Sequence, residues 1–313
     1  MLLTVTLNPS VDIAYHLNSF AMDEVNRVKQ VHKTAGGKGL NVTRVAKLLG
    51  LEALATGIIG GTVGSYISQQ LETDQIKHEF YQIDQESRNC IAILHEGKQT
   101  EILESGPDLT EQEGHKYLEK FGDILTKYSI KVLTISGSLP NGLSPELYKS
   151  MIKIANERNI AVVLDTSGDT LKTVLDDPSL RIAAIKPNEE ELSAIEEHPL
   201  SDNLEDWKQW LQSSRYASCE WVIVSMGSKG AFAKYKEEFY YAKIPSIRVV
   251  SPVGSGDATV AGIAKSLEEQ LAPEELLKTA MTAGILNAME NQTGFINIEN
   301  YKKYFDQIRV IKC

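Results

Sequence analysis

Short apolar segments alternate along the chain with segments in which apolar residues recur every three or four positions. The short segments are rich in Val, Ile and Leu, and each ends in polar or glycine residues, which is typical of buried strands. Alternation of such strands with helices predicts an α/β fold, in which a mostly parallel sheet is covered by helices on both faces. The six predicted strands are Leu2–Leu7, Leu54–Ile59, Val132–Ser136, Ala161–Asp165, Ile182–Lys186 and Trp221–Ser225.

Helix signals lie between these strands. The segment Leu40–Leu49 places its valines on one face and ends before Gly50, as an amphipathic helix does. Thr110 and Glu113 have the spacing of a capping box, and Ser144-Pro145 resembles a helix start with proline at the first position.

Two pairs of segments break this rhythm, because polar residues occupy their alternate positions. Such alternation favours a half-exposed antiparallel sheet over the buried core. We therefore predict one domain over residues 1–313, with a small β-rich lid drawn from about 11–33 and 88–104. The expected lid strands are Val11–Leu17, Arg27–Lys33, Asn89–His95 and Gln99–Glu104, with a turn at Glu96–Lys98.

Charge and cysteine content narrow the function classes. The chain has 32 Lys and Arg against 42 Asp and Glu, a net charge of −10, which argues against nucleic acid or anionic membranes binding the whole surface. The net negative charge is still compatible with a local basic pocket that binds a small anion. Cys90, Cys219 and Cys313 lie far apart, so neither a disulfide framework nor a zinc site is expected. No signal peptide or membrane segment is evident, so we expect a cytoplasmic protein.

Polar and small residues collect directly after the predicted strands. Open α/β sheets bind ligands at the carboxyl ends of their strands, so this pattern predicts a small-molecule site there. The segments concerned are Asn8–Ser10, Gly60-Gly61, Ser136–Ser138, Asp165–Ser167, Lys186–Asn188 and Ser225–Gly227.

The strongest chemical signal is Val253–Asp257, a Gly-Ser-Gly-Asp sequence that opens a run of small residues. Glycines on both sides of Ser255 allow backbone N–H groups to converge on an anion at a helix start. A carboxylate at Asp257 suits such a place when it accepts a proton from an attacking hydroxyl, as phosphoryl transfer requires. The alternative is a glycine-rich turn in which Asp257 only caps the helix. The chain contains neither the Walker A loop nor the dinucleotide-binding fingerprint.

A second signal is Gly36-Gly37-Lys38-Gly39, followed by Asn41 on a predicted helix. The glycines permit close backbone approach, the lysine adds a positive charge, and the amide can bond two sugar hydroxyls. The alternative is a flexible loop with a surface lysine.

Together these segments resemble the signatures of the PfkB (ribokinase-like) carbohydrate kinases. Lys186–Glu191 resembles the family's N-x-x-E motif, and Ser225–Gly230 resembles its nucleotide-binding S-x-G-x-x-G turn. The opening Leu7–Asp12 is similar to the branch that contains 1-phosphofructokinase and tagatose-6-phosphate kinase, and Ile91–Gly97 and Leu164–Asp169 are most similar to the latter. Ser255 departs from the commoner Gly-Ala-Gly-Asp, but backbone amides would still supply the donors.

The resemblance implies a ribokinase-like three-layer α/β/α sandwich, with ATP as co-substrate and Mg²⁺ as cofactor. It makes Asp257 the catalytic base, with the amides of Gly254, Ser255 and Gly256 as the anion hole, and Glu191 the residue near the metal. Substrate-binding roles fall to Asp12, Arg27, Gly37, Lys38, Asn41, Arg88 and Ser138. Nucleotide-binding roles fall to Lys186, Asn188, Ser225, Gly227, Gly230, Gly284 and Asn287.

Structural alternatives accompany several of these roles. Asn188 and Glu191 have capping-box spacing, Arg88 alone could be a solvated arginine, and the face with Gly284 and Asn287 could serve only close packing. Three functions stay open: a kinase of tagatose 6-phosphate, a 1-phosphofructokinase, and a non-catalytic sugar-phosphate sensor. An intact Asp257 disfavours the sensor. Exposed lid edges would be covered by pairing of two lids, so we expect a symmetric homodimer.

Overall fold

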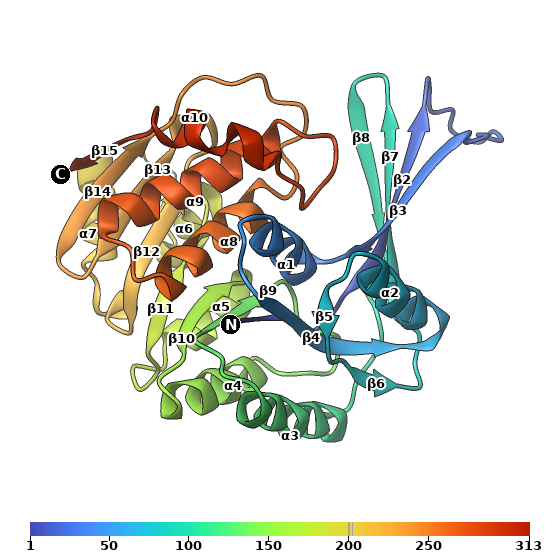
Figure 1. The fold of residues 1–313 in the computed structure, drawn as a ribbon, viewed down its shortest axis with the longest axis horizontal. Helices are drawn as coiled ribbons and strands as arrows, with labels where there is room; N and C mark the ends of the chain where they lie inside the picture. The colour runs from blue at the N-terminus through green and yellow to red at the C-terminus, as the bar shows by residue number, and fades with distance from the viewer. Residues whose placement is uncertain (200, 202) are drawn as a thin grey trace.

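One large sheet runs through the centre of the molecule (Figure 1). The structure is a computed structural model that describes residues 1–199, 201 and 203–313. Among these residues the sheet has eleven strands in the order β15-β14-β13-β12-β11-β10-β9-β1-β4-β5, with β6 also pairing β4. From β12 to β5 the pairs are parallel, whereas β12 to β15 are antiparallel. The strands are β1 (Leu2–Thr6), β4 (Ala53–Gly60), β5 (Lys77–His78), β6 (Tyr81–Ile83), β9 (Val132–Ser136), β10 (Ala161–Asp165), β11 (Ile182–Ile185), β12 (Cys219–Ser225), β13 (Ala231–Tyr235), β14 (Glu238–Lys243) and β15 (Arg309–Lys312).

Alternate residues of the central strands enter two separate hydrophobic cores. Leu3 and Val5 of β1 pack into one core, while Leu2 packs into the core on the opposite face. In β12, Val222 and Ile223 divide in the same way. Because successive side chains of a strand point to opposite faces, such continuous apolar strands require a helical layer on each side.

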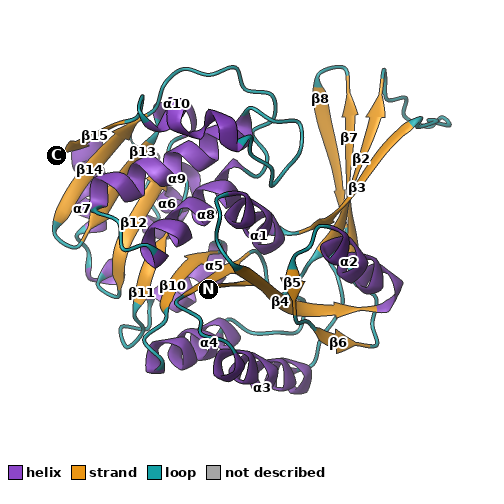
Figure 2. Cartoon of the chain, viewed as in Figure 1, coloured by secondary structure: helices purple, strands orange, loops and turns teal. Residues whose placement is uncertain are grey.

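Helices supply both layers, as Figure 2 shows. This confirms the expected three-layer ribokinase-like α/β/α fold, including the capping box of Thr110 and Glu113 at the start of α3. Over the described residues, no helix is long and apolar enough to cross a membrane. One layer contains α1 (Lys38–Leu48), α8 (Ser255–Glu268), α9 (Pro273–Ala288) and α10 (Tyr301–Phe305), and the other contains α3 (Glu111–Lys127), α4 (Glu146–Glu157), α5 (Gly168–Leu175), α6 (Glu189–Glu196) and α7 (Leu204–Leu211).

A second, four-stranded sheet projects from the body beside α2 (Gly61–Thr73), at the upper right of Figure 1. It consists of β3 (Gln30–Gly36), β2 (Ser10–Leu17), β7 (Arg88–His95) and β8 (Lys98–Leu103), in that order. We call this sheet the lid.

The lid differs from expectation in two ways. We expected an antiparallel sheet, and the pairs β2–β3 and β7–β8 are antiparallel, but β2 and β7 pair in parallel. The second difference concerns one strand. We expected a strand over Arg27–Lys33, but β3 begins at Gln30 and continues to Gly36. Its partner β2 ends at Leu17, and the last pair of the ladder joins His16 to Gln30. Residues 27–29 therefore lie beyond the partner strand and have no ladder to join.

Candidate active site

A large cleft opens between the lid, the carboxyl ends of the central strands and the start of α8. Its volume is about 2740 Å³, whereas pockets for one small molecule usually measure about 300–1,000 Å³. Two ligands can therefore share it. Sixteen of the nineteen site residues expected from the sequence line the cleft: Asp12, Gly37, Lys38, Asn41, Arg88, Lys186, Asn188, Glu191, Ser225, Gly227, Gly230, Gly254, Ser255, Gly256, Asp257 and Gly284.

The centre of the cleft is a hydrogen bond between Asn41 and Asp257. Asp257 lies in the first turn of α8 and is 6% exposed. Asn41 Nδ2 donates to Asp257 Oδ2 at 2.7 Å. Burial, and then the charge of Asp165, raise the pKa of Asp257 to about 7, although Asn41 and two lysines oppose the rise. A carboxyl group with such a pKa can take up a proton near neutral pH.

The start of α8 provides backbone donors. Gly254 is the N-cap residue and has φ 81°, a left-handed conformation that glycine adopts without strain. Gly256 and Asp257 lie in the first helical turn, where amides have no partner inside the helix. The amide of Ser255, however, donates to Pro252 O at 3.2 Å. Of the three amides expected in the anion hole, that of Ser255 is thus already occupied, because the loop closes back on itself there.

Two lysines flank a buried aspartate beside this helix start. Lys186 Nζ lies 3.6 Å from Asp165 Oδ1, and Lys38 Nζ lies 3.5 Å from Oδ2. Burial alone would raise the pKa of Asp165, but the two ammonium groups hold it below its ordinary value. A Cβ at Gly256 would lie 3.3 Å from Lys186 Nζ. The lysine is therefore held against the helix start, where it adds positive charge to the same anion site.

Asp165 was not among the site residues expected from the sequence. It is 4% exposed at the end of β10, and only its place after a strand indicated a role. Its importance comes from lysines that are distant in sequence.

Asp12 occupies the lid side of the cleft. Ser10 Oγ donates to its Oδ1 at 2.6 Å, and burial raises the pKa of Asp12 against the effect of this bond. A Cβ at Gly36 would come within 2.1 Å of the Asp12 carboxylate. A glycine is therefore required where β3 passes this side chain, which explains part of the Gly36-Gly37 pair.

Arg88 also lines the cleft, but part of its guanidinium is already engaged. Nε and Nη2 donate to Asn8 O at 3.2 and 3.0 Å, and Nη1 donates to Glu104 O at 3.1 Å. An arginine has five N–H donors, so two remain for a ligand. Arg88 therefore ties the lid to the end of β1 as well as facing the cleft.

The opposite end of the cleft contains the residues expected to bind the nucleotide. Ser225 N donates to Pro187 O at 2.9 Å. Gly227 and Gly230 have φ values of 53° and 101°, and a Cβ at Gly230 would lie 2.0 Å from Ala242 O. This turn therefore requires glycine on steric grounds alone.

Asn188 and Glu191 form the capping box that their spacing predicts. Asn188 Oδ1 accepts from Glu191 N at 2.7 Å, and Glu191 Oε2 accepts from Asn188 N at 2.9 Å. The second carboxylate oxygen of Glu191 has no part in the box, and the residue lines the cleft. One free carboxylate oxygen suits Mg²⁺, which keeps several waters and binds through few protein ligands when phosphates are present. Over the described residues, no group of three or more His, Cys, Asp or Glu side chains could hold a metal ion.

Three expected residues lie outside the cleft. Arg27 is exposed in the connection before β3, where no ladder holds it, and Ser138 is exposed after β9. Asn287 is buried in α9, and its Nδ2 donates to Phe295 O at 2.9 Å and Gln292 O at 3.3 Å. The amide nitrogen of Asn287 therefore secures the loop after α9, whereas its buried Oδ1 has no hydrogen-bond partner among the described residues. Gly284 lines the cleft but also packs closely, since a Cβ there would lie 2.5 Å from Thr259 Oγ1.

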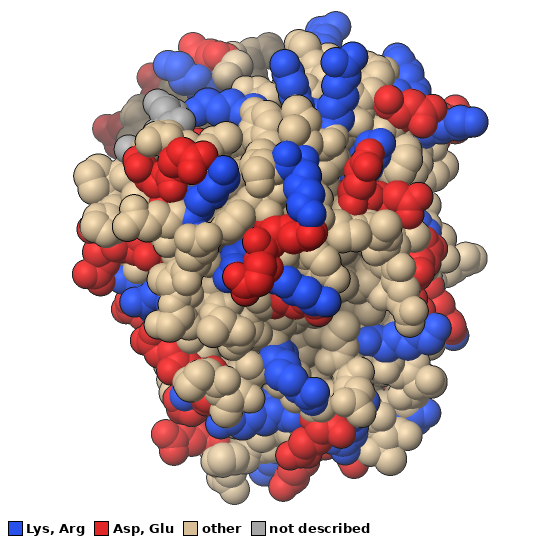
Figure 3. All heavy atoms as spheres, turned by 90° about the vertical axis from the view of Figure 1, so that its left-hand side faces the viewer, with Lys and Arg blue, Asp and Glu red and all other residues tan. Residues whose placement is uncertain are grey.

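Basic side chains in the cleft lie among acidic ones, which include Asp12, Asp165 and Asp257. Lys38, Lys186 and Arg88 gather there, although the chain carries a net charge of −10. On the face shown in Figure 3, acidic and basic side chains are intermixed, and neither sign forms a continuous field. Within the cleft, the start of α8 favours an anion, because Lys186 and backbone donors meet there.

Comparisons with known proteins agree with this geometry. The chain is 26% identical to Escherichia coli phosphofructokinase-2 in complex with fructose-6-phosphate, with a TM-score of 0.87 over 97% of this chain and 98% of that one. It is 29% identical to a Staphylococcus aureus protein provisionally assigned as a phosphofructokinase, with a TM-score of 0.84 over 100% and 99%. A Thermotoga maritima protein provisionally assigned as a 1-phosphofructokinase has the same fold, with 24% identity and a TM-score of 0.84 over 100% and 99%. The model of the pfkB family carbohydrate kinases matches residues 5–299, and the chain belongs to that family.

Proposed function

We propose that the chain is a cytoplasmic sugar-phosphate kinase that transfers the γ-phosphoryl group of ATP to the C1 hydroxyl of D-tagatose 6-phosphate. The product is D-tagatose 1,6-bisphosphate, an intermediate of lactose and galactose catabolism. The observation that carries the kinase chemistry is the buried pair of Asp257 and Asn41 at the start of α8, next to Lys186. The choice of tagatose rests on the resemblance of Ile91–Gly97 and Leu164–Asp169 to that enzyme.

In this reaction the C1 hydroxyl oxygen attacks the γ-phosphorus and forms the new O–P bond. The bond from the γ-phosphorus to the β,γ-bridging oxygen breaks, ADP leaves with that electron pair, and Asp257 accepts the hydroxyl proton. The amide of Gly256 and the ammonium group of Lys186 face the charge on the moving group. Catalysis then consists of positioning and electrostatic stabilisation, as is usual in phosphoryl transfer.

On the lid side, Asp12, Gly37 and Asn41 would bind sugar hydroxyls, and Lys38 would lie between the two substrates. Arg88 would hold the phosphate at C6 through its two remaining N–H donors. A guanidinium matches a phosphate better than an ammonium group does, because it is planar and offers paired donors.

On the other side, the turn at Ser225–Gly230 and the cleft face of Gly284 would bind ATP, with Asn188 nearby. Glu191 would hold Mg²⁺ through its water shell. The ion, when bound, would supply charge neutralisation at the ATP phosphates.

A second candidate substrate is a fructose phosphate. Escherichia coli phosphofructokinase-2, whose structure contains fructose-6-phosphate, shares this fold over nearly the whole chain, and 1-phosphofructokinase belongs to the same branch. These sugars differ from tagatose 6-phosphate in stereochemistry or in the position of the phosphate, while the transfer chemistry is the same. A non-catalytic sensor is disfavoured, because a sensor does not need a buried carboxylate at the anion site.

The substrate is tested by incubating the purified chain with ATP, Mg²⁺ and a panel of tagatose 6-phosphate, fructose 6-phosphate, fructose 1-phosphate and their unphosphorylated sugars. We expect the highest kcat/KM with tagatose 6-phosphate and little activity with free sugars. A preference for either fructose phosphate would change the proposed substrate but would still support a sugar-phosphate kinase. Failure to phosphorylate any ketose phosphate would contradict the proposed function.

We also propose a homodimer formed through the lid, since one lid carries several exposed apolar side chains. Val31 is 46%, Ile102 54% and Leu103 60% exposed. Pairing of two lids would cover them and protect the sheet edges. A related protein, the inhibited form of Escherichia coli phosphofructokinase-2, is a tetramer. Light scattering should give twice the chain mass of 34.6 kDa at micromolar concentration, and a monomer mass would contradict this proposal.

A further inference from the structure

Arg44 is a buried arginine directly behind the reacting groups, and none of the roles above uses it. It lies in α1, three residues after Asn41, and is 8% exposed. Arginine is rarely buried without partners, because its charge loses hydration. Here Nη1 donates to Ala35 O and Nη2 donates to Asn41 Oδ1, both at 2.5 Å. The guanidinium thus bridges the end of β3 and the amide that touches Asp257.

The contact with Arg44 determines which way the Asn41 amide points. A guanidinium only donates hydrogen bonds, whereas an amide has an accepting oxygen and a donating nitrogen. The Asn41 atom that faces Arg44 must therefore be the oxygen. Its nitrogen then faces Asp257 and donates at 2.7 Å. With the amide reversed, two oxygens would face each other at Asp257, and an unpaired nitrogen would face the guanidinium.

We propose that Arg44 is a positioning residue for the catalytic base, which acts through Asn41 by holding its amide in the orientation that donates to the ionised carboxylate of Asp257. The two-point contact with Ala35 O and Asn41 Oδ1 fixes the guanidinium, so that the fork, and not only the charge, is required. This role rests on the proposed function, in which Asp257 accepts the hydroxyl proton.

Charged groups from several elements surround the contacts that link Arg44, Asn41 and Asp257, which we call the relay. Asp12 of β2, Asp257 of α8 and Asp74 after α2 all favour the charged form of Arg44, against the burial that lowers its pKa. For Asp257, burial and Asp165 raise the pKa, whereas Asn41, Lys38 and Lys186 lower it. Loss of the Asn41 contact would therefore remove one of the groups that keep Asp257 ionised.

The loop after α9 covers the relay from the other side. Gly294 has φ 70°, and a Cβ there would lie 3.0 Å from Asn41 Oδ1 and 3.1 Å from Arg44 Nε. Nε is buried and has no acceptor among the described residues. The loop itself is secured by Asn287 through Phe295 O and Gln292 O. A side chain at position 294 would therefore press on both residues of the pair.

A purely structural role for Arg44 would be to tie α1 to β3 through Ala35 O. That role predicts lower stability when Arg44 is replaced, but no specific dependence on Asn41. The charge of Arg44 also favours the ionised form of Asp257 directly, but this effect would persist in the Asn41→Ala background and would be retained by Arg44→Lys. The two roles therefore differ in a double-mutant cycle and in the pH profile of Arg44→Lys, which keeps the charge.

The test compares wild type, Arg44→Met, Asn41→Ala and the double variant, with kcat and kcat/KM measured against pH using ATP, Mg²⁺ and the best ketose phosphate. We expect Arg44→Met to lower kcat by about 10- to 100-fold and to move the acidic limb of kcat/KM to higher pH. In the Asn41→Ala background, adding Arg44→Met should lower kcat by no more than about twofold, because Arg44 acts through that amide. Arg44→Lys should recover kcat only in part.

Ile152→Ala is the stability control, because Ile152 is buried in α4 on the other side of the sheet. It should lower the melting temperature without moving the pH limb. An unchanged limb in Arg44→Met, additive losses in the double variant, or complete rescue by lysine would each overturn the inference. If Arg44→Met does not fold, Arg44→Lys decides: a wild-type limb and kcat overturn it, and a displaced limb with reduced kcat supports it. Asp257→Asn is measured alongside, because an active Asp257→Asn would refute the proposed base itself.

Discussion

The side-chain nitrogen of Asn41 lies 2.7 Å from a carboxylate oxygen of Asp257, although the two residues are 216 positions apart in the sequence. The contact joins α1, which follows lid strand β3, to α8, which begins at the Gly-Ser-Gly-Asp sequence. It is the point where the expected sugar-binding and phosphate-binding segments meet.

The pH dependence of kcat/KM should have an acidic limb near pH 7. Burial raises the pKa of Asp257 to about 7, and only the ionised carboxylate can accept the hydroxyl proton. Activity should therefore fall about tenfold per pH unit well below that value and level off above it. Because kcat/KM reports the free enzyme, the limb should not depend on which ketose phosphate is used. A limb near pH 4, the ordinary range of a carboxyl group, would show that the base is another group or is exposed in solution.

Replacing Arg88 distinguishes its proposed contact with the substrate phosphate from its backbone contacts in the protein. Arg88→Ala should lower kcat/KM for the sugar phosphate by roughly 30- to 150-fold, since a charge-assisted fork to phosphate contributes about 2–3 kcal/mol. The KM for ATP should change little. Arg88→Lys should recover only part of the loss, because a point charge replaces a planar fork.

Kinetics with the unphosphorylated ketose provide the control for Arg88. That sugar has no phosphate to lose, so the selectivity between the two substrates should shrink by a similar factor. Equal damage to both substrates would indicate that the bonds to Asn8 O and Glu104 O are the whole role of Arg88. A preference for a phosphorylated substrate would then have to come from other residues.

Glu191→Gln should raise the Mg²⁺ concentration required for half-maximal activity by about tenfold, because a neutral amide replaces a carboxylate near the ion. Stability should change little, since glutamine also completes a capping box. Glu113→Gln is the matched control, because Glu113 forms the same capping box at α3 and does not line the cleft. An unaltered Mg²⁺ requirement in Glu191→Gln, or full activity of the wild type after exhaustive chelation, would contradict the role of Glu191 or of the ion, respectively.

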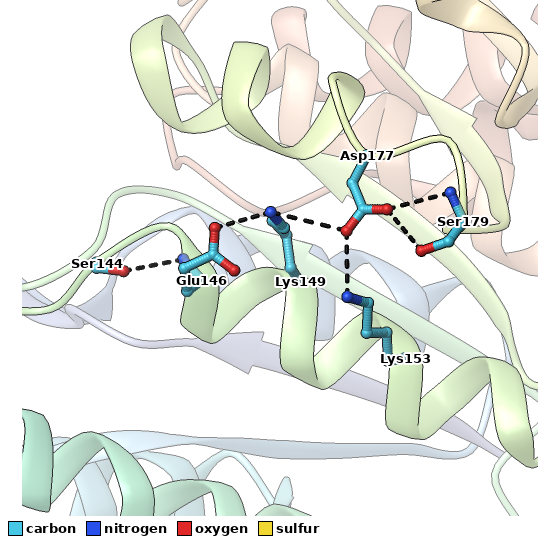
Figure 4. A network of polar contacts seen from close by, with 6 residues as sticks. All are labelled: Ser144, Glu146, Lys149, Lys153, Asp177 and Ser179. Carbon is cyan, nitrogen blue, oxygen red and sulfur yellow. Dashed lines mark hydrogen bonds and ion pairs between the residues drawn. The ribbon is translucent and has the colours of Figure 1, made fainter.

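A surface network far from the chemistry should contribute to acid stability. Asp177 accepts from Ser179 Oγ and N at 2.5 and 3.1 Å and lies 3.1 Å from Lys153 Nζ and 3.7 Å from Lys149 Nζ (Figure 4). The bond from Ser179, followed by the one from Lys153, lowers the pKa of Asp177 to about 2. A lowered carboxyl pKa means that the contribution is present above about pH 4 and is lost as pH falls through about 2.

Asp177→Asn should therefore lower the melting temperature at pH 7 by roughly 1–3 °C, the scale of an exposed ionic network. The difference from wild type should shrink between pH 4 and 2, and kinase activity should be unaffected. Asp123→Asn, at an exposed position of α3, should show no such pH-dependent difference. A deficit that persists at pH 2 would mean that shape, and not charge, holds this turn.

The sequence predicts the central parallel strands well, because each is a continuous apolar run buried on both faces. It predicts much less of the antiparallel edge. The strands β13 to β15 contain Lys234, Tyr241 and Lys312 beside apolar residues, and their pattern depends on which neighbour covers each face. The late start of β3 likewise depends on where β2 ends, which is a property of the pair and not of one segment.

For the site, glycine-rich segments are visible in the sequence because their backbone conformations demand glycine, as at Gly230 and Gly254. Side-chain networks are not visible in the same way. Asp165 and Arg44 have no local motif, and their partners are recruited from other elements by the fold. Asn287 shows the opposite case, because its position suggested a ligand while its amide bonds a loop.

The central claim, that Asp257 is the base of a sugar-phosphate kinase, is tested most directly by the turnover of Asp257→Asn. The amide keeps the size of the side chain but cannot accept the hydroxyl proton, so kcat should fall by at least about 100-fold. Binding of ATP and of the sugar phosphate, measured by calorimetry, should stay within about tenfold. Melting temperatures measured beside the kinetics distinguish a lost helix cap, which would lower stability with little specific effect on turnover. More than a tenth of wild-type turnover in a folded Asp257→Asn enzyme would contradict the account.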